Sequence, residues 1–138
     1  MSNHPTYSET TRKHFYQSLG KLFYAVAIAD KVIRPAEVQK IKEKIDEVWI
    51  DLDDMHDEYE TDMAFQMEIV FDWLQENEPD GQECFDEFVT FYEEHPALFT
   101  PKVKSMILST ANAIAGSFAG KNKAELIILA KLNILFRE

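Results

Sequence analysis

The stretch YAVAIADKVIRP, residues 24–35, joins an apolar run to an acidic turn and restarts on a proline. Residues 111–125, ANAIAGSFAGKNKAE, repeat this order near the other end of the chain, with small apolar residues, a loop and then a glutamate. Proline suits the first position of a helix, because the amide hydrogen that it lacks would have no partner there. The two stretches therefore predict two similar helix hairpins, one at each end of the chain, related by a pseudo-two-fold axis.

The remaining sequence also has helical spacing. Apolar residues recur at i, i+4, i+7, i+8 and i+11 from Phe15 to Val26 and again from Met63 to Leu74, as on one face of a helix. Turn and capping signals separate the helices: NEPDG at 77–81 with Asp80 as an N-cap and Glu83 three residues on, His-Pro at 95–96, and Thr100-Pro101. We predict one all-α domain spanning residues 1–138, with about six helices and an acidic middle helical pair flanking the end hairpins.

The last predicted helix, near residues 123–137, is apolar on most sides. Such a helix is usually surrounded by protein, which predicts a central position. We therefore expect Ile128, Leu129 and Leu132 to be largely buried. Asn122 and Glu125 repeat the spacing of an N-cap and its third-position partner.

The charge is unevenly distributed. The formal net charge is −11, and no lysine or arginine occurs between Lys44 and Lys102, whereas residues 46–101 carry 19 acidic residues. Such a surface repels nucleic acid and anionic lipid, and it suits cations or a basic protein partner. The alternative is a solvated face that only keeps the protein soluble. The candidate partner-binding residues lie in the acidic connection before the third helix: Asp51, Asp53, Asp54, Asp57 and Glu58.

Two features predict a cytoplasmic protein that does not insert into a membrane. The longest apolar stretch, residues 124–136, is well short of the ~20 residues that span a bilayer. The single Cys84 cannot form an internal disulfide, and the polar N-terminal residues contain no apolar signal core.

Residues 25–45, AVAIADKVIRPAEVQKIKEKI, resemble the signature of the TerB-like family, a helical domain named for a tellurite-resistance protein. That signature is an apolar helix ending in Ala-Asp-Gly, a short loop, and a helix opening with proline and glutamate. Residues 113–132 resemble the second copy found in the family. Lys31 replaces the usual glycine, and Gly116 stands where the first copy has Asp30. The resemblance implies a TerB-like bundle that acts as a non-enzymatic cytosolic adaptor in stress response or tellurite resistance, in some cases beside a membrane-protein partner, with divalent-cation binding suggested.

Asp30 and Glu37 could together ligate a divalent cation. However, Glu37 lies two residues after Pro35, at the helix position where a carboxylate meets free amides and the positive end of the helix dipole. Loop aspartates such as Asp30 commonly bond the backbone. We therefore favour capping and keep a weakly bound cation as the alternative. Residues 51–62 have the length of a calcium-binding EF-hand loop, but Met55, His56 and Asp62 occupy positions that require other residues.

No motif indicates an enzyme. The acidic surroundings of Cys84 disfavour a thiolate nucleophile. His56 and Glu60 lack the Glu-x-x-His partners of a di-iron bundle. The chain also has no glycine-rich phosphate-binding loop. The sequence predicts a non-enzymatic binding module of the stress-response type, with or without a cation response. The alternative is an acidic helical interaction module or inhibitor that binds a basic partner without metal, and the oligomeric state stays open.

Overall fold

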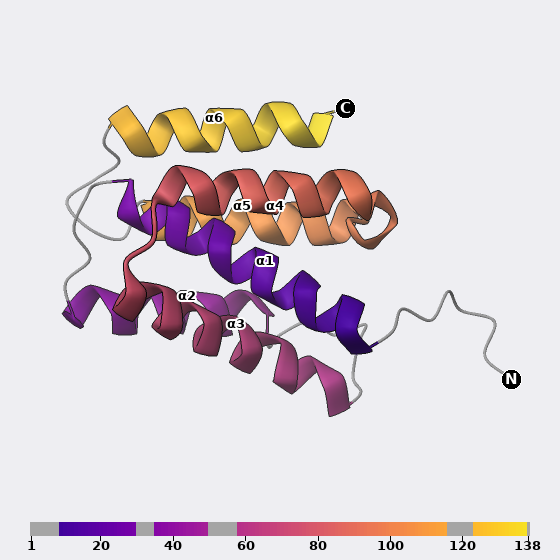
Figure 1. Ribbon diagram of the computed structural model, residues 1–138, viewed down its shortest axis with the longest axis horizontal. Coiled ribbons are helices and arrows are strands. Elements are labelled where there is room, and N and C mark those ends of the chain that lie inside the picture. The colour runs from indigo at the N-terminus through magenta and orange to yellow at the C-terminus, as the bar shows by residue number, and fades with distance from the viewer. Residues whose placement is uncertain (1–8, 30–34, 50–57, 116–122, 138) are drawn as a thin grey trace, which may run out of the picture.

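The computed structural model describes residues 9–29, 35–49, 58–115 and 123–137. These residues form six α-helices and a short 3₁₀ turn, and they contain no strand (Figure 1). The elements are α1 (Glu9–Ile28), α2 (Pro35–Trp49), α3 (Glu58–Asn77), α4 (Gly81–Glu94), η2 (Pro96–Leu98), α5 (Pro101–Ala115) and α6 (Lys123–Arg137). The predicted all-α fold with about six helices is confirmed.

Helix α1 is the centre of the molecule. It makes its most extensive contacts with α3 and α4, and it also contacts α5 and α6. Figure 1 shows it running between α3 and α4. Every residue from Leu22 to Ala27 is buried, so α1 is enclosed on all sides along this stretch. The middle helices α3 and α4 therefore flank α1 itself.

Helix α6 lies at an edge of the fold, and the expectation of a central position is wrong. It packs on α5 and, less extensively, on α1, and it forms one margin of the molecule in Figure 1. Leu129 and Leu132 are buried as expected, but Ile128 is only half-buried. The opposite side of the helix is apolar and exposed. Helix α6 is therefore apolar on most sides without being surrounded by protein.

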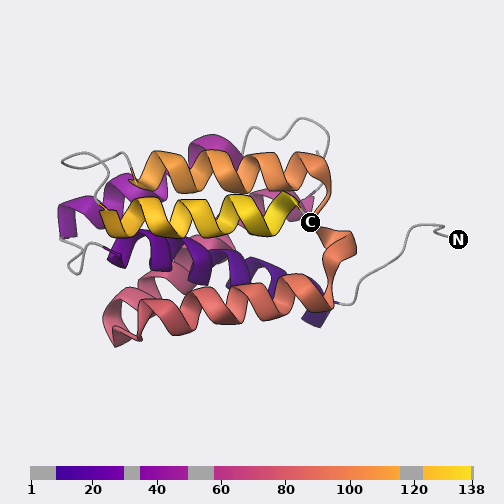
Figure 2. The ribbon, with the colours of Figure 1, turned by 90° about the horizontal axis from the view of Figure 1, so that it is seen from above.

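The two end hairpins have different neighbours. Helices α5 and α6 pack on each other, whereas α2 packs mainly on α3 and α5. The first helix of one hairpin, α1, contacts both middle helices, whereas α5 contacts α1, α2 and α6. Figure 2 shows α5 and α6 side by side.

The helix ends form at the capping residues that the sequence predicts. The carboxylate of Asp80 accepts a hydrogen bond from the backbone N–H of Glu83 at 3.1 Å, which satisfies a free amide in the first turn of α4. The hydroxyl of Thr100 likewise accepts from the N–H of Val103 at 3.2 Å at the start of α5. Helix α4 ends at Glu94, just before His95-Pro96. These boundaries follow from chemistry within a few residues of each helix end.

A cluster of aromatic rings joins four elements at one end of the bundle. Phe99, which follows η2 and is buried, lies edge-on to Phe15 of α1 and Phe88 of α4, with ring centroids 5.3 and 5.8 Å apart. Tyr92 of α4 lies 4.9 Å from the same ring, and Phe136 of α6 lies 5.4 Å from Tyr92. Edge-to-face pairs of this kind add to the stability that buried area provides. The cluster fixes the C-terminal end of α6 on α4.

Candidate interaction site

Most of the site residues expected from the sequence fall outside what the structure describes. Helices α2 and α3 include Glu37 and Glu58, but the side chains of these two residues are not among those described. The other predicted residues lie outside the described ranges: Asp30, Asp51, Asp53, Asp54 and Asp57. Within the described residues, no group of three or more histidine, cysteine, aspartate or glutamate side chains could hold a metal ion.

The outer face of α4 carries five exposed carboxylates. This helix is amphipathic: its inner side buries Cys84, Phe85, Phe88 and Tyr92. The residues on its outer side are exposed, and their carboxylates recur at helical spacing: Glu83, Asp86, Glu87, Glu93 and Glu94. No basic residue lies on α4 to balance them. The outer side of α4 thus carries an acidic strip, with no acidic residue between Glu87 and Glu93.

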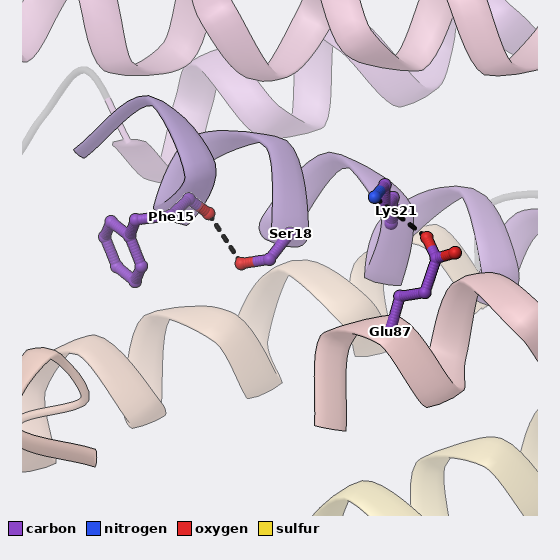
Figure 3. A network of polar contacts seen from close by, with 4 residues as sticks. All are labelled: Phe15, Ser18, Lys21 and Glu87. Atoms are coloured by element: carbon purple, nitrogen blue, oxygen red, sulfur yellow. Dashed lines mark hydrogen bonds and ion pairs between the residues drawn. The ribbon is translucent and has the colours of Figure 1, made fainter. Parts of the chain in front are cut away.

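One ion pair connects this strip to α1. The Nζ atom of Lys21 lies 2.8 Å from Oε1 of Glu87 (Figure 3). One turn earlier in α1, the hydroxyl of Ser18 donates a hydrogen bond to the carbonyl of Phe15 at 2.7 Å, which satisfies a polar group that is buried. Because both partners of the Lys21–Glu87 pair are partly exposed, the pair contributes little to stability. Its effect here is to place a lysine between α4 and the neighbouring surface of α3.

That neighbouring surface is apolar. Trp73 of α3 is 59% exposed and Ile69, one turn before it, is 45% exposed. Both residues line a surface cavity of about 410 Å³ between α3 and α1, together with Gln17, Lys21, Val70 and Leu74. Lys21 therefore belongs both to this cavity and to the ion pair with α4. We call the cavity and the acidic strip together the Trp73 surface.

A second cavity of about 410 Å³ lies at the other side of α4. It is lined by the end of α1, by the turn between α3 and α4, and by the first half of α6, including Ile28, Asp80 and Ile127. Lys131 of α6 also lines it, opposite the polar residues of that turn. This cavity separates α6 from the first turn of α4.

The buried thiol beside the acidic strip is poorly ionised. Burial raises the pKa of Cys84 to about 11, and the nearby carboxylate of Glu87 acts in the same direction. The sequence-based expectation of a disfavoured thiolate is borne out, with burial as the larger cause. Burial also raises the pKa of Tyr24 above its ordinary value, with a further contribution from Cys84.

Sequence reasoning missed Trp73 and Ile69. The inward stripe of α3 was correctly expected to include Met67, Phe71 and Leu74, which are buried. Trp73 and Ile69 are spaced i, i+4 but fall off that stripe. Two large apolar residues with this spacing on the otherwise acidic side of a helix were the available signal.

No protein-family model matches this chain, and no curated protein or solved structure is significantly similar to it. The TerB-like resemblance therefore rests on residues 25–45 and 113–132 alone. None of the helices in the described ranges is both long enough and apolar enough to cross a membrane.

Proposed function

We propose that this chain is a non-enzymatic protein-interaction module that binds a basic, partly apolar protein surface through the Trp73 surface. One observation carries the proposal: the most exposed large apolar side chain in the described residues, Trp73, lines a cavity at the border of an acidic strip. A large aromatic anchor with a polar margin is the usual arrangement of an energetically important interface centre.

The two parts of the Trp73 surface would have different roles. Desolvation of Trp73 and Ile69 provides affinity, because buried tryptophan is prominent among the residues that dominate binding energy. The carboxylates of α4 attract a basic partner and orient it, which raises the association rate and gives specificity. Lys21 does not oppose this attraction strongly, since Glu87 neutralises it at 2.8 Å.

A model peptide can test the proposal directly. A helical peptide made only of leucine and lysine at amphipathic spacing presents the proposed partner chemistry. Titration calorimetry should detect its binding, and affinity should fall as salt rises because exposed charges are screened. The same residues in an order without amphipathic spacing provide the control peptide.

Matched variants locate the binding surface. Trp73→Ser should weaken peptide binding at least about tenfold, as expected for the loss of an interface anchor. Ala97→Ser changes an exposed apolar residue of η2, away from the Trp73 surface, and it should leave peptide affinity unchanged. If neither peptide binds, or if both variants bind as the wild type does, the proposed function is wrong.

The adaptor role in stress response that the TerB-like resemblance implies is a proposal of the same kind. It is supported by residues 25–45 and is compatible with a binding module without catalysis. A cation held by Asp30 and Glu37 also stays a prediction. Calorimetric titration with calcium, magnesium, zinc and manganese tests it, with Glu37→Gln as the variant that should lose binding if these side chains are ligands.

A further inference from the structure

The geometry points to a second copy of this chain as the occupant of the Trp73 surface, in a head-to-tail contact with the outer face of α6. This inference rests on the proposed function, because it names the partner of the same surface. The outer face of α6 supplies what the Trp73 surface requires, namely apolar side chains with basic residues around them.

Helix α6 leaves a large part of its apolar surface uncovered. Leu126 is 50% exposed, Ile127 is 47% exposed and Ile134 is 57% exposed. The charged residues exposed beside them are basic: Lys123, Lys131 and Arg137. Glu125 is the acidic residue of α6, whose residues are all described, and it is buried. The exposed face of α6 is therefore apolar and purely basic.

Charge distinguishes a head-to-tail contact from a symmetric one. In a symmetric dimer each surface meets itself. If α6 of one copy met α6 of another in antiparallel orientation, Lys123 would face Arg137. In parallel orientation, Lys123 would face the same lysine of the other copy. If the Trp73 surface met itself, carboxylates such as Glu83 and Glu87 would face carboxylates. Like charges placed opposite each other disfavour both arrangements. Of these three arrangements, the contact of α6 with the Trp73 surface is the one that brings opposite charges together.

The positions of the two faces also favour contact between copies. Helix α6 and helix α3 lie at opposite edges of the molecule (Figure 1). The two faces cannot meet within one chain, but each is open to a neighbour. One repeated contact would cover all the large apolar residues that the described part of the chain exposes: Ile69, Trp73, Leu126, Ile127 and Ile134.

A contact of this type does not end at two copies. Each bound copy still offers one free face, so association continues into a chain or closes into a ring. A contact made by helix faces belongs to the small interfaces, which are weak and transient. We therefore expect a dissociation constant between about 1 μM and about 1 mM.

Sedimentation velocity can measure the expected self-association. The sedimentation coefficient of the wild-type protein should rise with concentration up to about 1 mM, with species beyond the dimer. Added salt should reverse the rise, because it screens the opposed charges. Ala97→Ser, a mild change at an exposed position of η2, is the control and should behave as the wild type.

Two blocked variants give the decisive measurement. Ile69→Ser with Trp73→Ser removes the anchors of one face, and Ile127→Ser with Ile134→Ser removes those of the other. Each variant alone should be monomeric. A mixture of the two should form a one-to-one complex and nothing larger, because each retains the face that the other lacks. Circular dichroism confirms that both variants are folded.

Specific outcomes would overturn the inference. A wild-type protein that stays monomeric to about 1 mM excludes the contact. A wild-type protein that stops at a dimer, or a mixture that does not form a complex, indicates a symmetric contact. None of these results affects binding of the leucine–lysine peptide, so the inference can fail while the proposed function holds. If the peptide does not bind but the mixture forms a complex, the proposed binding of other basic proteins is wrong, whereas the head-to-tail self-association is correct.

Discussion

The hydroxyl of Tyr24 in α1 donates a hydrogen bond to the carbonyl of Pro79, 55 positions later, at 3.3 Å. The Tyr24 ring is 1% exposed and lies edge-on to Phe71 of α3, with ring centroids 6.1 Å apart. The central helix is thereby bonded to the turn that precedes Asp80, the N-cap of α4. This contact sets where the acidic strip begins relative to the core.

Tyr24→Phe tests the contribution of that hydrogen bond. The variant keeps the ring against Phe71 but leaves the carbonyl of Pro79 without this donor. We expect the free energy of unfolding to fall by about 0.5–1.5 kcal/mol, the usual net value of such a bond. Urea denaturation measures it, and the m-value should not change, because the surface exposed on unfolding is the same. An unchanged midpoint would show that water replaces the bond without cost.

The stability of the protein should fall in alkali through Cys84. The pKa of the Cys84 thiol has its ordinary value of 9.0 in the unfolded chain and is about 11 in the folded protein. Above about pH 9 the unfolded state loses a proton that the folded state keeps, which favours unfolding. The contribution of the protonated thiol to the free energy of unfolding is therefore fully present below pH 9, and it is lost as the pH rises to about 11. Urea melts at several pH values measure this loss.

Cys84→Ala is the matched variant for the alkaline loss. It should be less stable than the wild type at neutral pH, because it removes a buried sulfur, but its stability should fall less steeply between pH 9 and 11. Both proteins should also carry Tyr24→Phe, because Cys84 contributes to the raised pKa of Tyr24 and that effect would otherwise differ between them. Equal slopes for the two proteins would contradict the prediction.

One-sided burial of α6 predicts very different effects for two leucines on the same helix. Leu132 is completely buried, whereas Leu126 is 50% exposed. Leu132→Ala should cost about 2–5 kcal/mol, because it leaves a cavity. Leu126→Ala should cost less than about 1 kcal/mol. Denaturant melts at low protein concentration compare them, and similar costs would place α6 within the core.

Gly20 allows α1 to approach α3 closely. A Cβ atom at this position would lie 2.9 Å from Cγ1 of Val70 and 3.3 Å from the carbonyl oxygen of Met67. Alanine normally stabilises a helix relative to glycine, but here Gly20→Ala should lower the free energy of unfolding by about 1–3 kcal/mol. Thermal melts give the sign of the effect at once.

A double-mutant cycle isolates the cause. Val70→Ala removes Cγ1, the nearest atom, but keeps Cβ at 3.1 Å, so Gly20→Ala should be less harmful in that background. The expected interaction energy is at least about 0.5 kcal/mol, as for residues in direct contact. Additive effects would mean that Cβ of residue 70, the carbonyl of Met67 or a shift of the whole helix sets the cost.

The sequence predicts features that depend on near neighbours. The start of α2 at Pro35 and the bond from Glu83 to Asp80 follow from chemistry within one turn of a helix. The placement of whole helices depends on distant partners. Gly20 allows α3 close to α1, whereas the larger apolar residues of α6 suggested enclosure that does not occur.

The sequence predicted that the candidate site is acidic, but it did not predict which residues form it. The sequence identifies residues 46–101 as acidic, but the residues favoured for binding were mostly those of the loop that precedes α3. The exposure of Trp73 depends on which side of α3 packs against α1, and that choice requires the tertiary structure. A rule that searches acidic helices for large apolar residues off the inward stripe would have found it.

The enclosed position of α1 has a consequence for synthesis of the chain. The helices that enclose it, α3 and α4, are completed only at Glu94, about 65 residues after α1 ends. At translation rates of about 5–20 residues per second, α1 waits roughly 3–13 s before its partners exist. Once α1 has left the ribosome, its apolar residues stay open to chaperones or to other nascent chains until α3 and α4 follow. Truncation before α4 should therefore yield an aggregating fragment.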